Sequence, residues 1–200
     1  MSRIVVVNFV TLDGVIQSVL SADEDRDGGF EAGGWVQPYM DEVVARVMSE
    51  ATTGAGGLLL GRRTYQNFAA TWSVADRGEP AVAALNRMPK YVASTTLAAT
   101  DWENSRILGE DLVAEVTELK KQPGGDIVVF GSGRLIPALA AADLIDRYTL
   151  LTFPLVLGTG KRMFADGFAP ATLTLLGSEV STTGVVVLRY GRASSTNTGG

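Results

Sequence analysis

The 200-residue sequence predicts an α/β fold with a mostly parallel central sheet, helices on both faces and a C-terminal antiparallel hairpin. Three observations support this prediction. Runs such as Ile4–Val10 and Ile127–Phe130 are apolar at nearly every position, as in strands buried on both faces. Segments with apolar residues at helical spacing alternate with such runs. Two further runs, Thr172–Leu176 and Val185–Tyr190, are joined through a turn, which predicts the hairpin.

The first half of the chain follows this alternation. After the first strand, Ser21–Gly34 is acidic and rich in glycine and predicts a long loop. Pro38 suits the first position of a helix, and helical spacing continues to about Ala51. The next expected elements are a strand at Leu58–Leu60, a helix carrying Tyr65, Phe68 and Trp72, a helical turn at Ala81–Leu85 and a strand at Lys90–Ser94.

The second half adds a short strand, two helices around the Ile127–Phe130 strand, and a longer strand. The short strand is expected at Arg106–Leu108, and the helices carry Leu112, Val116 and Leu119, and then Leu135, Ile136 and Leu139. Ile145–Val156 is a long apolar strand, and Pro154 places it near an edge or a bulge because proline cannot donate to the ladder. Without repeats or linkers, residues 1–192 are expected to form one domain. Residues 193–200 are small and polar and predict a disordered tail.

The composition of the chain argues against several classes of partner and catalytic site. A net charge of −5 argues against nucleic acid as a partner. No signal peptide and no apolar stretch long enough to cross a membrane is recognisable, which predicts a cytoplasmic protein. The chain has no cysteine and no histidine, which excludes disulfides, catalytic triads and Cys/His metal sites, and we expect no metal. The mean hydropathy of +0.18 and the apolar Val185–Leu188 run predict a homodimer.

A glycine-rich turn joins the Ile127–Phe130 strand to the helix after it. Gly131, Ser132 and Gly133 would expose unpaired N–H groups at the positive end of that helix, which is how α/β proteins hold phosphate. The dinucleotide pattern G-x-G-x-x-G fails, because its last position is Ile136. The alternative is a tight strand–helix turn without a ligand.

Two other strand ends carry groups that suit phosphate. Arg62, Arg63 and Thr64 follow Gly61, and arginine forks match phosphate oxygens. Ser94–Thr96 offers hydroxyl donors after the third strand. A solvated helix start and a plain turn are the alternatives. Together the three strand ends favour an extended phosphate ligand, since ligands of open α/β sheets lie at these ends.

Several charged residues could serve a reaction at this edge. Asp13 follows the first strand, although an Asp-Gly turn explains it equally well. Asp41 lies near a helix start, where the helix dipole alone favours an acid. Lys161 and Arg162 could bind an anionic substrate or be exposed turn residues.

Five motifs in order give the chain a family resemblance over about residues 3–192. They are Thr11–Gly14, Leu60–Tyr65, Pro89–Leu97, Phe130–Leu135 and Pro154–Phe164. The chain resembles the dihydrofolate reductase superfamily, and within it the bacterial branch similar to the C-terminal reductase domain of the riboflavin-biosynthesis bifunctional deaminase/reductase. The resemblance implies a dihydrofolate reductase-like fold.

The resemblance also implies NADPH as cofactor. It assigns the adenosine-side phosphates to Gly61–Thr64 and Ser94–Thr96, and the pyrophosphate to Gly131–Leu135. The expected cofactor-binding residues are therefore Gly61, Arg62, Arg63, Thr64, Ser94, Thr95, Gly131, Ser132, Gly133, Arg134 and Leu135. The resemblance also places Trp35 and Asp41 near the tryptophan and the acid of the folate enzymes, and we assign Trp35, Thr152 and Lys161 to substrate binding.

The resemblance implies a reductase that transfers a hydride to a C=N or C=O bond of a small heterocycle, of the pterin or riboflavin-pathway pyrimidine class, such as 5-amino-6-(5-phosphoribosylamino)uracil. Asp13, Asp41 or an ordered water would supply the proton. The loop Ser21–Gly34 differs from the short mobile loop of folate reductases, and the chain lacks the deaminase half. An NADPH-binding regulatory module without turnover and another nucleotide- or flavin-dependent enzyme are the alternative functions.

Overall fold

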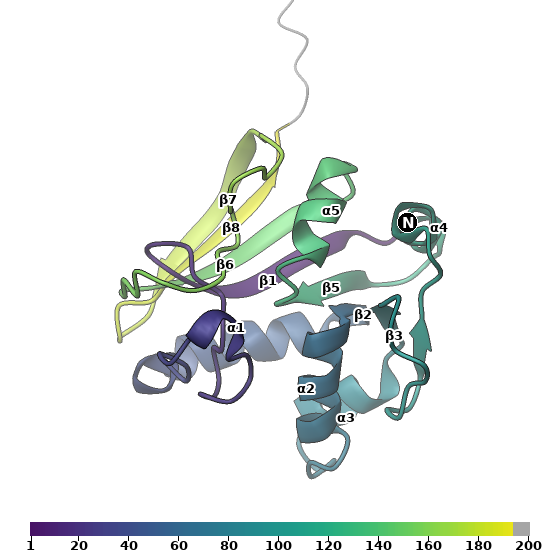
Figure 1. Cartoon of the computed structure of the whole chain (residues 1–200), viewed down its shortest axis with the longest axis horizontal. Coiled ribbons are helices and arrows are strands. Elements are labelled where there is room, and N and C mark those ends of the chain that lie inside the picture. The colour runs from purple at the N-terminus through teal and green to yellow at the C-terminus, as the bar shows by residue number, and fades with distance from the viewer. Residues whose placement is uncertain (194–200) are drawn as a thin grey trace, which may run out of the picture.

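A computed structural model describes residues 1–193, which form an eight-stranded sheet and five α-helices (Figure 1). The strands are β1 (Ile4–Thr11), β2 (Ala55–Gly61), β3 (Lys90–Ala93), β4 (Ser105–Ile107), β5 (Asp126–Phe130), β6 (Arg147–Phe153), β7 (Leu173–Val180) and β8 (Val186–Arg192). The helices are α1 (Glu42–Thr53), α2 (Arg62–Trp72), α3 (Pro80–Arg87), α4 (Leu112–Lys121) and α5 (Leu135–Ala141). The strand order is β4-β3-β2-β5-β1-β6-β8-β7.

The sheet confirms the predicted fold class. The six strands from β4 to β6 pair in parallel, and β8 and β7 add the antiparallel hairpin at one edge. In β1, Val5 and Val7 pack with α1, α2 and α3, whereas Ile4 and Val6 pack with α4 and α5 on the opposite face (Figure 1). This alternation explains why β1 is apolar at nearly every position.

The topology gathers the strand ends that matter for function. Because β1, β2, β3 and β5 are parallel, their carboxyl ends lie at one edge of the sheet. The chain leaves this edge from β2 into α2 and from β5 into α5, and the two helices cover opposite faces. Two strand–helix junctions far apart in sequence thus become neighbours.

The prediction that a helix begins at Pro38 is wrong. Pro38 lies in a short 3₁₀ turn, Gln37–Tyr39, and Met40 is extended. The α-helix starts at Glu42 because the Asp41 carboxylate accepts a hydrogen bond from the Val44 N–H at 3.0 Å and caps the first turn. Proline fixes only its own φ, whereas the capping side chain of Asp41 determines where the helix starts.

The expectation that Pro154 puts its strand near an edge is also wrong. β6 ends at Phe153 and lies between β1 and β8, inside the sheet. Pro154 follows the strand, so its missing N–H is not needed for the ladder.

Two smaller expectations differ in extent or in scope. The helical turn expected at Ala81–Leu85 is a full helix, α3, which starts with Pro80. The tail expected at 193–200 lies outside the described residues apart from Ala193, and the single-domain boundary stays a prediction.

Lys90 is a fully buried lysine at the start of β3. Its Nζ donates hydrogen bonds of 2.8 Å to the carbonyls of Asn86 and Glu103 and lies 4.2 Å from the centre of the Trp102 ring. Burial lowers the pKa of this amine to about 8. A neutral amine still has two N–H donors for the two carbonyls, so the uncharged form keeps both hydrogen bonds.

We predict that the protein becomes more stable as pH rises from about 8 to 10.5. The pKa of Lys90 is lower in the folded chain than the ordinary 10.5, so in this range the unfolded chain binds more protons and rising pH favours folding. The expected gain approaches about 1 kcal/mol per pH unit, measured by urea unfolding. The variant Lys90→Met is the control and should lack the gain attributable to this group; an identical pH dependence would contradict the assignment.

Candidate functional site

A cavity of about 1180 Å³ opens at the carboxyl ends of β1, β2, β3 and β5. It exceeds the range of about 300–1,000 Å³ that is usual for a pocket holding one drug-sized ligand. All eleven residues expected to bind a cofactor line it, namely Gly61, Arg62, Arg63, Thr64, Ser94, Thr95, Gly131, Ser132, Gly133, Arg134 and Leu135. The three strand ends recognised in the sequence therefore border one cavity.

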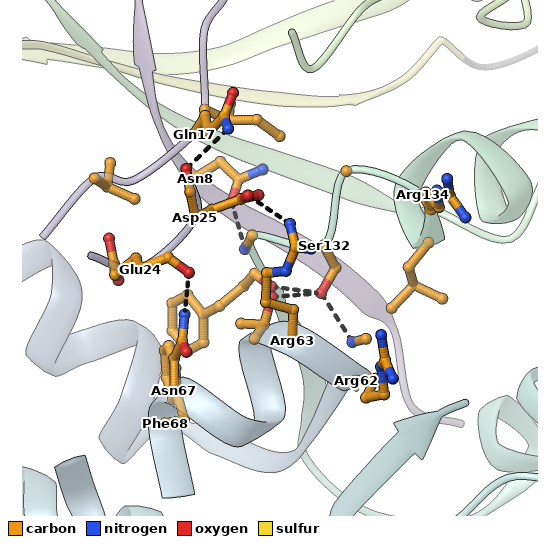
Figure 2. A pocket seen from close by; sticks show the side chains of 18 of the residues that line it. Asn8, Gln17, Glu24, Asp25, Arg62, Arg63, Asn67, Phe68, Ser132 and Arg134 are labelled. Carbon is orange, nitrogen blue, oxygen red and sulfur yellow. Dashed lines mark hydrogen bonds and ion pairs between the residues drawn. The ribbon is translucent and has the colours of Figure 1, made fainter. Parts of the chain in front are cut away.

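Ser132 joins two of these strand ends. Its hydroxyl oxygen accepts a hydrogen bond of 2.9 Å from the Gly61 N–H and lies 3.2 Å from the Thr64 hydroxyl (Figure 2). Ser132 has a φ of +64°, which is uncommon for a residue other than glycine and is typical of strained functional turns. The hydrogen bonds across the two junctions hold the turn in this conformation.

Gly131 continues the same turn toward β1. Its N–H donates a hydrogen bond of 2.7 Å to Oδ1 of Asn8, a buried side chain in the middle of β1. Sequence reasoning missed Asn8 as a site residue, although a polar residue inside an apolar strand was a visible signal. The side chains of Ser132 and Asn8, which both line the cavity, thus connect the three strands β1, β2 and β5.

Four charged residues form an ion cluster over the cavity: Asp25, Asp27, Arg63 and Lys161. Arg63 lies 2.5 Å from Asp25 and 2.7 Å from Asp27, and Lys161 lies 2.6 Å and 2.7 Å from the same two carboxylates. The cluster fastens the Ser21–Gly34 loop to α2 and to the turn around Lys161. Arg63 and Lys161 line the cavity as expected, but their charges are already matched.

The ion cluster keeps its acids ionised. Hydrogen bonds from Lys161 and Arg63 lower the pKa of Asp27 to about 2. Burial opposes ionisation of Asp25, but the same two cations outweigh it and lower its pKa as well. Neither carboxyl group is therefore suited to donate a proton near neutral pH.

Arg62 and Arg134 stand in contrast to Arg63. Both line the cavity, and within residues 1–193 neither has a carboxylate within ion-pair distance. Figure 2 shows both on one side of Ser132, with Arg63 directed toward Asp25. No side chain in the described part of the chain caps the start of α2, so its first N–H groups are available there. Unmatched guanidinium groups beside a free helix start suit phosphate.

The two expected catalytic acids do not line the cavity. Asp13 accepts hydrogen bonds from the Thr11 hydroxyl and from the N–H groups of Leu157 and Gly158, which lower its pKa to about 2. Asp41 caps α1, and the Val44 N–H is the main cause of its lowered pKa. Both are structural acceptors that stay ionised at neutral pH.

Two of the expected substrate residues also lie elsewhere. Trp35 is buried, donates a hydrogen bond of 2.9 Å from its indole to the Gln17 carbonyl and packs against Phe153. Thr152 pairs with Val186 inside the sheet. Neither borders the cavity, whereas Lys161, the third, does.

In the part of the chain that the structure describes, no three His, Cys, Asp or Glu side chains are grouped so that they could hold a metal ion. No helix within that part is sufficiently long and apolar to cross a membrane.

Comparisons with known proteins agree with the fold. Residues 3–187 match the family model of the RibD C-terminal domain. The protein YyaP of Bacillus subtilis (strain 168) is 34% identical over 101 residues, which are 50% of this chain. The match spans only about half of that relative (53%).

Two solved structures share the fold over nearly the whole chain. A protein from Shewanella sp. PV-4, assigned to riboflavin biosynthesis, has a TM-score of 0.69 at 20% identity, with 96% of this chain and 99% of that chain covered. A pyrimidine reductase-like protein from Corynebacterium diphtheriae has a TM-score of 0.67 at 12% identity, with 96% and 92% covered.

We predict that Gly131→Ala destabilises the protein by about 1–2 kcal/mol, the cost of a left-handed conformation for a residue with a Cβ. Gly131 has a φ of +55°, and a Cβ there would lie 3.2 Å from Oγ1 of Thr64. Gly133→Ala is the matched control, because its Cβ would meet no atom closer than 3.6 Å. Urea unfolding measures both, and equal effects would contradict the role of the Gly131 turn.

Proposed function

The chain belongs to the RibD C-terminal domain family, and from this membership and the cavity we propose that it is an NADPH-dependent reductase. It transfers a hydride to a C=N or C=O bond of a small heterocycle, of the pterin or riboflavin-pathway pyrimidine class. The observation that carries the proposal is the line of phosphate-compatible groups at three strand ends around one cavity.

The residues present fit a dinucleotide. The uncapped start of α2 and Arg62 suit the adenosine-side phosphates, together with the hydroxyls of Ser94 and Thr95. The Gly131–Leu135 turn, with Arg134, suits the pyrophosphate. NADPH would supply the hydride, while the protein orients the reacting atoms and excludes water.

The proton is proposed to come from an ordered water. Asp13 and Asp41 lie outside the cavity, and Asp25 and Asp27, which line it, are ionised by their cation partners. Among the three proton sources that the sequence allowed, this arrangement of the acids supports water. Each C=O reduction then consumes one NADPH and one proton and yields NADP⁺ and an alcohol.

One observation favours the second candidate, an NADPH-binding module without turnover. Asp25 and Asp27, two of the acidic residues that line the cavity, have lowered pKa values, so neither of them is a ready proton donor. Titration with NADPH, followed by oxidation assays on pterins, pyrimidines and carbonyl compounds, separates the candidates. Tight binding without any oxidation would support the module, and turnover would support the reductase.

We predict that Arg62→Ala weakens NADPH binding by about tenfold or more and weakens NADH binding much less. An ion-paired hydrogen bond to a phosphate is worth about 1.5–3 kcal/mol, and NADH lacks the 2′-phosphate. Fluorescence titration of both nucleotides measures the difference.

Arg63→Ala is the matched control for Arg62→Ala. Its guanidinium is held by Asp25 and Asp27, so its loss should release the loop and affect both nucleotides alike. Equal losses of NADPH and NADH in Arg62→Ala would remove Arg62 from the 2′-phosphate site. If neither nucleotide binds the wild type at micromolar concentration, the proposed function is wrong.

We also propose that the protein is a homodimer, but the residues that support this proposal differ from those expected from the sequence. Val185 and Val187, part of the run on which the expectation rested, are buried inside the single chain. The exposed apolar residues lie on the edge strand β7, where Leu175, Leu176 and Val180 are 53–68% exposed. An unpaired edge with exposed apolar side chains favours association.

Light scattering tests the dimer. The wild type should have twice the mass of one chain, and Leu176→Glu should shift it toward the monomer. Val74→Glu is the control, because Val74 is equally apolar and 82% exposed but is not on β7. A monomeric wild type would contradict the proposal.

A further inference from the structure

One end of the cavity is an apolar groove between α1, α2 and α3. We define the groove by the side chains of Ala45, Met48, Ser49, Phe68, Trp72 and Leu85, all of which line the cavity. On α1 the first three are spaced by three and four residues, and on α2 Phe68 and Trp72 are spaced by four, so each helix presents one face to the groove. Neither the strand-end motifs nor the proposed cofactor residues account for this groove.

The groove is separated from the unmatched cations. Arg62 starts α2 and Trp72 ends it, so the two lie about 15 Å apart along the helix axis. Beyond Arg62 and Arg63 in its first turn, α2 brings no cation to the cavity, and within the described chain α1 and α3 bring none. The Arg46 side chain of α1 pairs with Glu50 and Glu179 instead.

The charges nearest the groove are acidic or already matched. In Figure 2, Glu24, Asn67 and Phe68 lie on the side of Ser132 opposite Arg62 and Arg134. Glu24 lines the cavity, and its main-chain carbonyl accepts a hydrogen bond from Asn67. The cations between the two ends belong to the ion cluster, whose carboxylates would repel a phosphate.

The walls of the groove suit a flat ring. The Phe68 ring is stacked on Phe130, with ring centres 5.6 Å apart and planes inclined by 26°. The centre of the Trp72 ring lies 6.5 Å from that of Phe68. Aromatic faces bind flat π-systems, and the flexible thioether of Met48 can adjust to the outline of a ring. Ser49 adds an exposed hydroxyl that could donate a hydrogen bond to a carbonyl oxygen.

We propose that the groove takes a flat, uncharged aromatic or heteroaromatic carbonyl or imine compound that carries no phosphate. A phosphate in the groove would lose water without gaining an unmatched cation, which is strongly unfavourable. The proposal rests on the proposed reductase function, because the groove is where the substrate would meet the nicotinamide end of NADPH. The carbonyl carbon accepts the hydride from NADPH, which becomes NADP⁺, and the carbonyl oxygen takes a proton from water.

The test uses two probes that differ only in a phosphate, 2-naphthol and 2-naphthyl phosphate. Calorimetric titration of the full chain saturated with NADP⁺ should show that 2-naphthol binds at least tenfold more tightly. Equal or tighter binding of 2-naphthyl phosphate overturns the proposal. Failure of both probes to bind also overturns it.

A charge placed in the groove provides the matched variant. Ala45→Arg adds a guanidinium at an exposed position of α1 that lines the cavity, and it should improve binding of 2-naphthyl phosphate about tenfold. Gln66→Arg adds the same charge at an exposed position of α2 outside the cavity and should change neither probe's affinity. An equal effect of both variants overturns the assignment of the groove.

Failure of the groove proposal can be distinguished from failure of the proposed reductase function. NADPH binding by the same protein is measured first, by fluorescence. If NADPH binds and the probes fail, the groove proposal is wrong and the reductase proposal stands. If NADPH does not bind, the reductase proposal is wrong, and with it the claim that the groove holds a reducible substrate.

Discussion

The hydroxyl of Ser132 is the contact on which the arrangement of the site depends. It links the β2–α2 junction to the β5–α5 junction through the Gly61 N–H, and Gly131 beside it is held by Asn8 of β1. Ser132 has a left-handed φ that is unfavourable for a residue other than glycine, and the conformation persists because neighbouring strands hold it. Because the hydrogen bonds cross three strands, the phosphate-compatible groups of two junctions keep a fixed relative position.

The two ends of the cavity differ in charge. Within residues 1–193, Arg62 and Arg134 have no carboxylate partner at one end, the ion cluster neutralises itself in the middle, and the groove between α1, α2 and α3 is apolar. A dinucleotide with its phosphates at the cationic end would direct its other end toward the groove. An anionic group is therefore favoured at the cationic end and disfavoured in the groove, where the nearest charges are acidic or paired.

Much of the fold could be predicted from the sequence because it depends on local patterns. Doubly buried strands and amphipathic helices are visible in the spacing of apolar residues, and the four strand–helix alternations follow from it. The errors came from rules applied without tertiary context. A helix was predicted to start at Pro38, but it starts after Asp41, whose side chain caps it. Pro154 was read as a sign of an edge strand, but β6 ends at Phe153, before the proline. The assignment of Trp35 and Thr152 to substrate binding stays a prediction; Trp35 donates a hydrogen bond to the Gln17 carbonyl, and Thr152 pairs with Val186 in the sheet.

The sequence by itself determined the fold class, the family motifs and the strand ends that border the cavity, since each is a property of a short continuous segment. Only the tertiary structure decided which of two adjacent arginines is available. Among the described residues Arg62 has no carboxylate partner, whereas Arg63 is paired with Asp25, which also pairs with Lys161, 136 residues further along the chain. The physical reason is that charge pairing depends on distances across the fold. Such distances follow from the paths of the loops and not from the spacing of residues in the chain.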